Sequence, residues 1–364
     1  MIRKIANTLK WLPYYLHREF NRNYRDPAVN PKHIYFCICD HFEPYWNKAD
    51  RVTAKKRIHR WMCEYPKIAE RYPDSDGRSL NYTFFYPEEE YQEEDMNELA
   101  KLCQAGFGEV EIHLHHDNDT SKNLRSTLVD YKNRLYEKHG LLSKSRHSGE
   151  ISYGFIHGNW ALANSRHDGR WCGVNDEISI LQETGCYADF TLPSAPSETQ
   201  TRKVNSIYYA VDESGKPKSH DWGVNAEVGK KGEGLLMVQG PLCLTWKHRK
   251  SGFLPGIENG GLFANNPPTL ERIHSWVNTG ISVDGAGEHV FVKIYTHGTQ
   301  EGIMEMLFDD NNLSKLFSGL HDFSEENGGT LHYVSARELT NVVLAIQNSN
   351  TINVTDMRDC MFCR

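Results

Sequence analysis

The stretch EVEIHLHHDND, residues 109–119, combines an alternating strand pattern with three histidines and two aspartates. In a strand, successive side chains face opposite sides, so Glu111, His113 and His115 share one face and the intervening apolar residues share the other. Imidazole nitrogens and carboxylate oxygens at these spacings suit Zn²⁺ or a similar divalent ion. We therefore expect a metal site here; the alternative is an exposed edge strand whose histidines are solvated.

Short apolar runs alternate with helical patterns on both sides of this stretch, which predicts a parallel β/α architecture. Expected strands are 33–39, 80–86, 109–115, 153–157, 187–192 and 290–295, with a last strand and helix at 330–347. Expected helices are 51–71, 88–106, 120–138, 176–185, 268–278 and two within 299–326. Residues 205–261 break this rhythm with strand pieces and Gly- and Lys-rich turns, which predicts an inserted β-hairpin region.

One elaborated domain accounts for this order, since single β/α barrels reach this length with insertions. We assign residues 31–347 to that domain, with the insertion at about 205–261. Residues 1–30 form a basic and aromatic N-terminal segment, and residues 348–364 form a C-terminal tail.

Charge and composition exclude several classes of protein. A net charge of −7 argues against general nucleic-acid binding, which needs a clustered basic surface. No apolar run is long enough to span a bilayer. Residues 1–25 mix basic and aromatic side chains, so they are expected either to pack on the domain or to touch an anionic membrane surface. Nine cysteines without a framework spacing predict reduced thiols and a cytoplasmic protein.

Ionisable residues follow four of the predicted strands. They are Asp40 with His41, the run His113 to Asp117, His157, and His297. In β/α barrels the carboxyl ends of the strands share one face, and that face carries the active site. The sequence therefore predicts that these residues lie together at the carboxyl end of the barrel.

The order of these motifs resembles the polysaccharide deacetylase superfamily over roughly residues 33–300. Five stretches carry the resemblance. The first is Cys39-Asp40-His41, which stands where the family has an aspartate pair. The others follow in the family's order: Glu109 to His113 with Asp117, Phe155 to Trp160, Gly185 to Phe190, and Val292 to Gly298. The resemblance implies a distorted barrel of the (β/α)7 type. It also implies a metal-dependent hydrolase that removes N- or O-acyl groups from a glycan or sugar.

Roles for individual residues follow from this resemblance. The expected ligands of a divalent ion, taken as Zn²⁺, are Asp40, His41, His113, His115, His116 and Asp117, with the last three as alternatives for one position. Asp40 is the expected general base, and His297 is expected to protonate the leaving group. The expected contacts with the carbohydrate substrate are Trp46, His157, Asn159 and Trp160.

Three other functions stay open at this stage. His113-x-His115 also resembles the HxH signature of metal-dependent phosphoesterases and amidohydrolases, although there it lies on the first strand. A glycosidase would need two carboxylates, for which Glu43 and Asp189 are candidates. The chain could also be a glycan-binding barrel without catalytic activity.

Overall fold

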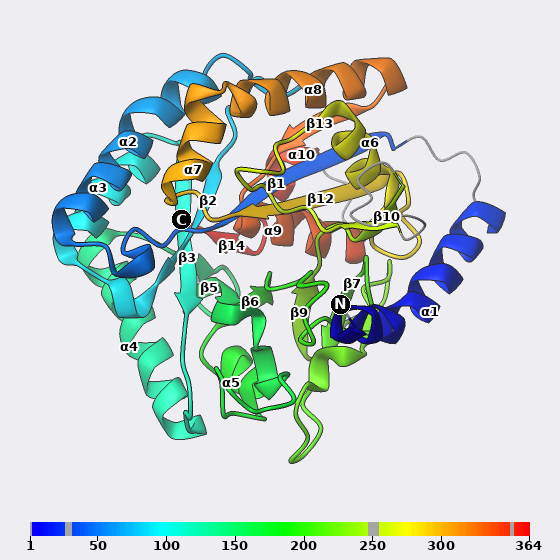
Figure 1. The fold of residues 1–364 in the computed structure, drawn as a ribbon, viewed down its shortest axis with the longest axis horizontal. Coiled ribbons are helices and arrows are strands. Elements are labelled where there is room, and N and C mark those ends of the chain that lie inside the picture. The colour runs from blue at the N-terminus through cyan, green and yellow to red at the C-terminus, as the bar shows by residue number, and fades with distance from the viewer. Residues whose placement is uncertain (1, 26–30, 247–254, 350–352) are drawn as a thin grey trace.

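A twelve-stranded, mostly parallel sheet organises the computed structural model, which describes residues 2–25, 31–246, 255–349 and 353–364 (Figure 1). The strands are β1 (His33–His41), β2 (Tyr82–Pro87), β3 (Gly108–Leu114), β4 (Ser143–Ser145), β5 (Ile151–His157), β6 (Cys186–Asp189), β7 (Ile207–Ala210), β8 (Val224–Asn225), β9 (Leu235–Val238), β12 (His289–Thr296), β13 (Thr330–Tyr333) and β14 (Phe362–Cys363). A separate antiparallel pair is formed by β10 (Cys243–Thr245) and β11 (Gly256–Glu258).

The neighbouring strands run in the order β12-β1-β2-β3-β5-β6-β9-β7-β8. All pairs from β12 to β9 are parallel, whereas β7 pairs in the antiparallel sense with both β9 and β8. This confirms the predicted α/β class. No ladder joins β12 to β8 among the described strands, so a closed (β/α)7 barrel stays a prediction.

Helices cover both faces of the sheet. They are α1 (Ile2–Arg25), α2 (Arg51–Ala69), α3 (Glu93–Gln104), α4 (Ser121–His139), α5 (Glu177–Glu183), α6 (Leu270–Asn278), α7 (Glu301–Met304), α8 (Asn312–Asn327), α9 (Ala336–Gln347) and α10 (Val354–Met357). Several begin at capping residues that sequence patterns favour: Asp50 caps α2, Thr120 caps α4, and Ser335 forms a capping box with Glu338 in α9.

The central strand β1 shows why the sheet is buried on both sides. Ile34, Phe36 and Ile38 pack into one hydrophobic cluster, with side chains of α2, α3, α4 and α8. The alternate residues Tyr35 and Cys37 pack into a second cluster, with side chains of α9. We call the side of the first cluster the outer face and the side of the second cluster the inner face. A buried parallel strand needs apolar residues on both faces, and this explains the continuous apolar run at the start of the domain.

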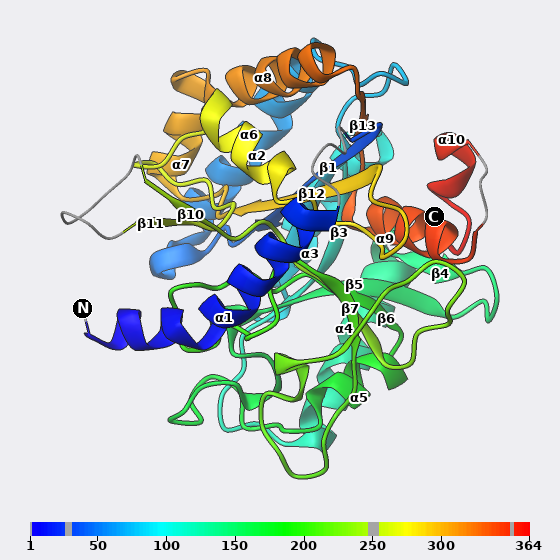
Figure 2. The same ribbon diagram turned by 90° about the vertical axis from the view of Figure 1, so that its right-hand side faces the viewer.

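Helix α1 lies across loops of the inserted region, and Figure 2 shows it on the side facing the viewer. Trp11 is fully buried against Ala195, Val204 and Leu242. The N-terminal segment therefore packs on the domain, as one of the two alternatives predicted. None of the described helices combines the length and the apolar character that crossing a bilayer requires.

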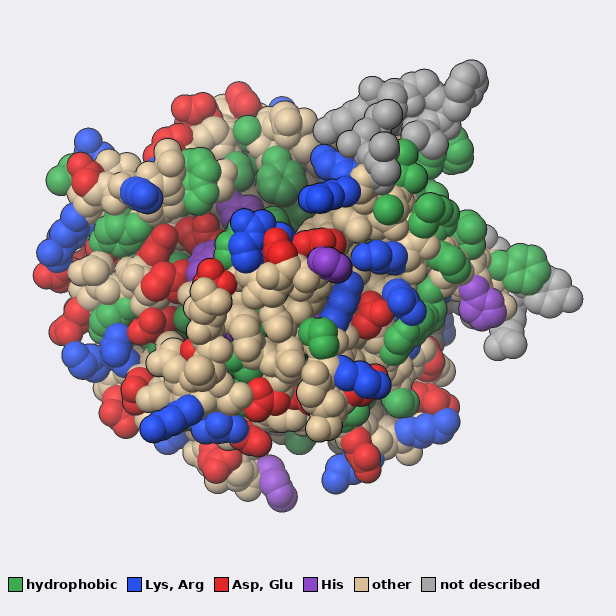
Figure 3. All heavy atoms as spheres, turned by 60° about the horizontal axis from the view of Figure 1, so that its bottom comes forward, with side chains coloured by type: hydrophobic (Ala, Val, Ile, Leu, Met, Phe, Trp, Pro, Cys, Tyr) green, Lys and Arg blue, Asp and Glu red, His purple; other side chains and the backbone are tan. Residues whose placement is uncertain are grey.

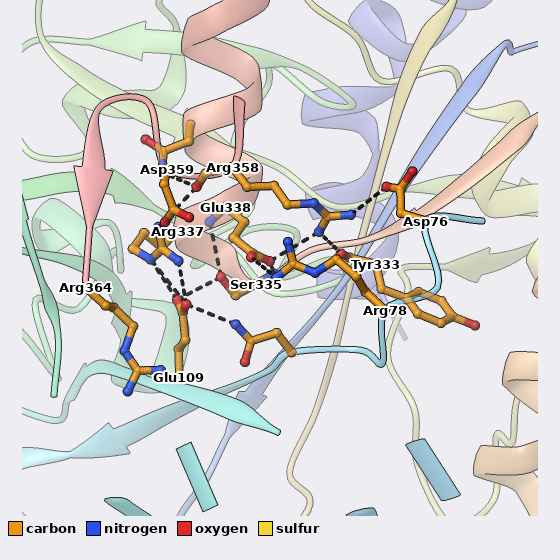
Figure 4. A network of polar contacts seen from close by, with 12 residues as sticks. Asp76, Arg78, Glu109, Tyr333, Ser335, Arg337, Glu338, Arg358, Asp359 and Arg364 are labelled. Carbon is orange, nitrogen blue, oxygen red and sulfur yellow. Dashed lines mark hydrogen bonds and ion pairs between the residues drawn. The ribbon is translucent and has the colours of Figure 1, made fainter. Parts of the chain in front are cut away.

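The last residues of the chain are tied to the amino ends of β2 and β3. Figure 4 shows Arg358 directed at acidic residues that precede β2, and Arg337 directed at Glu109 on β3. The strand β14 pairs with β4, so the predicted C-terminal tail is partly ordered by the sheet. This network lies at the end of β3 opposite to His113.

Candidate metal centre

The register of the parallel strands brings the predicted polar residues to one edge of the sheet. Asp40 pairs with Thr296, so His41 and His297 follow at the same level. On the other side, His113 pairs with Pro87 and with Ile156. The carboxyl ends of β12, β1, β2, β3 and β5 therefore meet, as the sequence predicted.

Glu43 lies at the centre of a cluster of four histidines at this edge. Its Oε1 atom is 3.1 Å from Nε2 of His113, 3.7 Å from Nε2 of His115 and 3.9 Å from Nδ1 of His297. The ring of His41 lies 4.9 Å from that of His113 and 4.6 Å from that of His297. Two ligand atoms at about 2.1 Å from a tetrahedral ion are about 3.4 Å apart, so these spacings match a metal site.

Two imidazoles are held in orientation by hydrogen bonds from the ring nitrogen that points away from Glu43. Nδ1 of His113 lies 2.9 Å from the carbonyl oxygen of Ile156, and Nδ1 of His115 contacts a carboxylate oxygen of Glu89. With Nδ1 engaged, each Nε2 atom faces Glu43: without a metal, Nε2 of His113 hydrogen-bonds Oε1 of Glu43, and with a metal each Nε2 would present its lone pair to the ion. Two lone pairs and a carboxylate repel one another unless a proton or a cation lies between them.

The side of the cluster formed by His115 and His297 is open to solvent. The side chain of His115 is 31% exposed and that of His297 is 16% exposed, whereas His113 is fully buried. The Nδ1 atom of His297 is itself buried and has no hydrogen-bond partner among the described residues. Figure 3 shows histidine side chains in a hollow of one face, with both acidic and basic side chains around them. The cluster can be reached from solvent through His115 and His297.

Charge within the cluster favours an ionised Glu43. Burial acts to raise the pKa of this carboxyl, but its contacts with His113 and His297 outweigh burial and hold the pKa well below the usual range. Burial also lowers the pKa of His41 far below its ordinary value, so this imidazole is neutral. A neutral imidazole beside a carboxylate is the protonation state that metal binding requires.

Asp40 lies outside the cluster, on the outer face of β1. Its Oδ1 atom accepts a hydrogen bond of 2.7 Å from the backbone N–H of Gly298, and its Oδ2 atom accepts one of 3.0 Å from the Tyr82 hydroxyl. Burial raises the pKa of Asp40 to about 7 in spite of these bonds. Because Gly298 follows His297, Asp40 positions the loop that carries this histidine.

Comparison with protein-family models gives no match, and comparison with curated proteins gives none either. The geometry of the cluster is therefore the basis for inferring its chemistry.

Aromatic side chains lie beside the cluster. Trp160 is near His41 and His297, with ring centroids at 6.0 Å and 6.2 Å. Trp46 and Phe263 line a pocket of about 400 Å³, together with polar residues of the chain segment after His297. The Phe263 ring also stacks on His297, at 6.4 Å, so the pocket adjoins the cluster.

The backbone at Trp160 adopts a strained conformation. Asn159 and Trp160 both have positive φ angles, of 55° and 57°. Non-glycine residues rarely adopt this conformation, and in proteins it is concentrated at functional sites. The indole N–H of Trp160 is buried without a hydrogen-bond partner in the described part of the chain, which leaves a donor next to the cluster.

The remaining predicted residues lie elsewhere. Asp117 is exposed, and its Oδ1 atom accepts backbone N–H groups of Asn118 and Trp171. His116 and His157 face a different group of residues on the outer side of the sheet. Strand alternation explains the division, because His41 and His113 point to the inner face whereas His157 points to the outer one.

Sequence reasoning missed the central role of Glu43 and the orienting role of Glu89. The sequence pointed to Glu43 only as a candidate glycosidase carboxylate. A signal was present in each case: Glu43 follows His41 by two residues at the end of a strand, and Glu89 follows the end of β2. Both lie in loops that succeed parallel strands, where functional residues concentrate.

Proposed function

We propose that the protein is a metal-dependent hydrolase that removes an acyl group from an amino sugar or glycan. The observation that carries this proposal is that Glu43 is shared by two groups of potential metal ligands, one with His41 and His297 and one with His113 and His115. A bound divalent ion, expected to be Zn²⁺, would supply hydroxide near neutral pH and polarise the acyl carbonyl. The implied distorted (β/α)7 barrel belongs to the same proposal.

The protein's own side chains have three tasks in this proposal. Glu89 orients His115, and Asp40 positions His297 through the backbone of Gly298. His297 lies on the open side, where its imidazole can reach a bound substrate. We place it as the proton donor to the departing amine or alcohol. Asp40 is proposed as a positioning residue, because both of its oxygens are engaged on the far side of β1.

The neighbouring pocket supports a sugar as the substrate. Trp46 and Phe263 offer aromatic faces, and Asn265 and Gln300 offer amide groups beside them. Sugar rings stack on aromatic faces and take hydrogen bonds from amide side chains. A pocket of about 400 Å³ accommodates a small ligand of this kind.

A second candidate function is that of an HxH-type phosphoesterase or amidohydrolase. It is favoured by the fact that His113 and His115 both face Glu43, which also belongs to the group with His41 and His297. A carboxylate shared by two groups of ligands is suited to bridge two ions, as in two-metal hydrolases.

Metal analysis combined with substrate trials tests these proposals. We expect Glu43→Gln and His113→Ala to lose the bound ion and to lose release of acetate from N-acetylated sugars by at least about a hundredfold. His147→Ala alters an exposed histidine outside the cluster and serves as the matched control. Release of phosphate from an aryl phosphate, with no release of acetate, would favour the second candidate. A wild-type protein that binds no divalent ion at micromolar concentration would contradict both.

A further inference from the structure

A second group of potential ligands lies on the outer face of the sheet. His116 follows β3, His157 ends β5, Cys172 lies in the loop before α5, and Glu177 begins α5. Their ligand atoms all lie within 4.8 Å of one another. His157, Cys172 and Glu177 are fully buried, and the side chain of His116 is only 7% exposed. Unlike the cluster around Glu43, this group is closed to solvent.

Both imidazoles of this group direct a nitrogen at the same carboxylate oxygen. Nε2 of His116 is 3.3 Å from Oε1 of Glu177, and Nε2 of His157 is 3.7 Å from it. The Nδ1 atoms, which point away from Glu177, contact hydrogen-bond acceptors. Nδ1 of His116 lies 3.0 Å from a carboxylate oxygen of Asp119, and Nδ1 of His157 contacts the carbonyl oxygen of Gly158. These contacts place the lone pairs of the Nε2 atoms inward, as in histidines that bind metals.

The inner nitrogen of His157 is the observation that calls for a further partner. This Nε2 atom is buried and has no hydrogen-bond partner among the described residues. A buried polar atom without a partner costs about 1–3 kcal/mol, so such atoms are uncommon unless a water or an ion satisfies them. Here the atom faces two other donor groups at the spacing of a coordination sphere.

The sulfur of Cys172 lies among amide donors and beside the Glu177 carboxylate. The backbone N–H groups of Asn164 and Val174 lie 3.3 Å and 3.4 Å from its Sγ atom. The Sγ atom is also 3.3 Å from Oε2 of Glu177. Without a metal, the thiol donates to the Glu177 carboxylate. A bound cation would replace that proton, and the amide N–H groups would then donate to the thiolate.

We propose that His116, His157, Cys172 and Glu177 form a structural zinc site. Four protein ligands that are closed to solvent are typical of structural rather than catalytic zinc, and a thiolate with two imidazoles favours zinc over magnesium or calcium. Binding releases the thiol proton of Cys172 to solvent. The ion holds together β3, β5 and the loop of residues 158–176. Because that loop carries Trp160, the site fixes an indole beside His41 and His297, although the proposal does not depend on the function of those histidines.

Cobalt substitution tests the proposal, because only this group contains a cysteine. Full-length protein produced with cobalt in place of zinc is expected to show a thiolate-to-cobalt charge-transfer band in the near ultraviolet. Cys172→Ser should abolish the band and reduce the metal content from about two ions per chain to about one. Glu43→Gln should lose the other ion and retain the band, so failure of the proposed hydrolase site is distinguished from failure of this one.

Matched variants separate ligation from damage to the fold. Cys186→Ser alters another buried cysteine outside the group and should keep the band. Cys172→Asp replaces sulfur by oxygen and should keep the ion while it loses the band. In the wild-type protein, a chelator should increase alkylation of Cys172 severalfold. A cobalt protein without the band, a band that survives Cys172→Ser, or alkylation unaffected by chelator would each overturn the proposal.

Discussion

Gly298 lies so close to the Asp40 carboxylate that no larger residue fits there. A Cβ atom at this position would lie 2.1 Å from Oδ2 of Asp40 and 2.6 Å from the Trp61 ring. We expect Gly298→Ala to lower the free energy of unfolding by about 1–3 kcal/mol and to displace His297, which weakens zinc binding. Urea unfolding and zinc titration measure both effects. Gly287 has open space around its Cβ position, so Gly287→Ala is the control; equal results for the two variants contradict the prediction.

Glu111 is a buried carboxyl on the inner face of β3 that the proposed chemistry does not use. Burial raises its pKa from 4.5 to about 8, although the Tyr187 hydroxyl and the Gly154 N–H donate hydrogen bonds to it. The folded protein therefore binds this proton more tightly than the unfolded chain does. The stability that results is complete below a pH of about 4.5 and is lost as the pH rises to about 8.

We expect Glu111→Gln to remove this pH dependence, because the amide mimics the protonated acid. In the wild-type protein, Glu111 makes the unfolding free energy fall with rising pH by up to about 1.4 kcal/mol per pH unit between the two pKa values. Glu111→Gln should remove this fall. Urea unfolding at several pH values across this range measures the slope. Glu150 is exposed, and Glu150→Gln should keep the wild-type slope. A wild-type slope in Glu111→Gln would show that the carboxyl is ionised in the folded protein.

At the scale of elements, most strands and helices could be predicted because each leaves a local signal. The apolar run at 33–39 is β1, the helical period at 51–71 is α2, and the pieces at 207–211 and 235–239 are β7 and β9. These signals come from burial on one or both faces of a segment, and burial is periodic in the sequence.

The candidate site could be predicted only in part, because its composition depends on which face each side chain takes. His41, His113, His115 and His297 all lie around Glu43, whereas Asp40 and His157 lie on the outer face. Glu177 and Cys172 join His116 from a loop some sixty residues away in the sequence, a proximity that only the sheet order β3-β5-β6 produces. No local pattern encodes that contact.

Trp11 is the one buried side chain of helix α1 among those whose burial is described. Trp11 is fully buried and contacts Tyr15 edge to face, at 5.8 Å, within a small cluster of its own. We expect Trp11→Ala to cost about 3–5 kcal/mol at this contact and to release the helix. Limited proteolysis should then remove the N-terminal segment faster. Leu9 lies on the same helix and is 59% exposed, so Leu9→Ala should leave the cleavage rate unchanged; equal rates for both variants contradict this role of Trp11.

At the scale of the whole molecule, the sheet separates two groups of residues that could each hold a metal ion. The cluster around Glu43 opens on the inner face, and the group around Glu177 is closed on the outer face. His115 and His116 are adjacent in the sequence, yet each belongs to a different group. A single strand end can therefore serve both a reactive site and a structural one, because alternation directs neighbouring side chains apart.

The opposite end of the sheet is held by buried charges of the C-terminal residues. Arg358 is fully buried; it lies 3.2 Å from Asp74 and 3.5 Å from Glu338, which are also buried, and it donates to the carbonyl of Tyr333 (Figure 4). Glu338 caps α9, and Asp74 precedes β2. One guanidinium thus links the C-terminal residues, a helix cap and the entry to the sheet.

Arg358→Met tests whether this link stabilises the entire fold, since methionine keeps much of the volume and removes the charge. Asp74 would then lack its cation, whereas Glu338 would keep its ion pair with Arg78. Loss of one partner from a buried ion pair costs about 3–5 kcal/mol. We expect a decrease of that size in the unfolding free energy, measured by urea titration. Arg170 pairs with Asp168 at the surface, and Arg170→Met should cost less than about 1 kcal/mol. Similar small losses in both variants would mean that the C-terminal residues are not part of the cooperative fold. A large loss confined to Arg358→Met would show that the end of the chain is needed to hold the sheet on which the candidate metal centre is built.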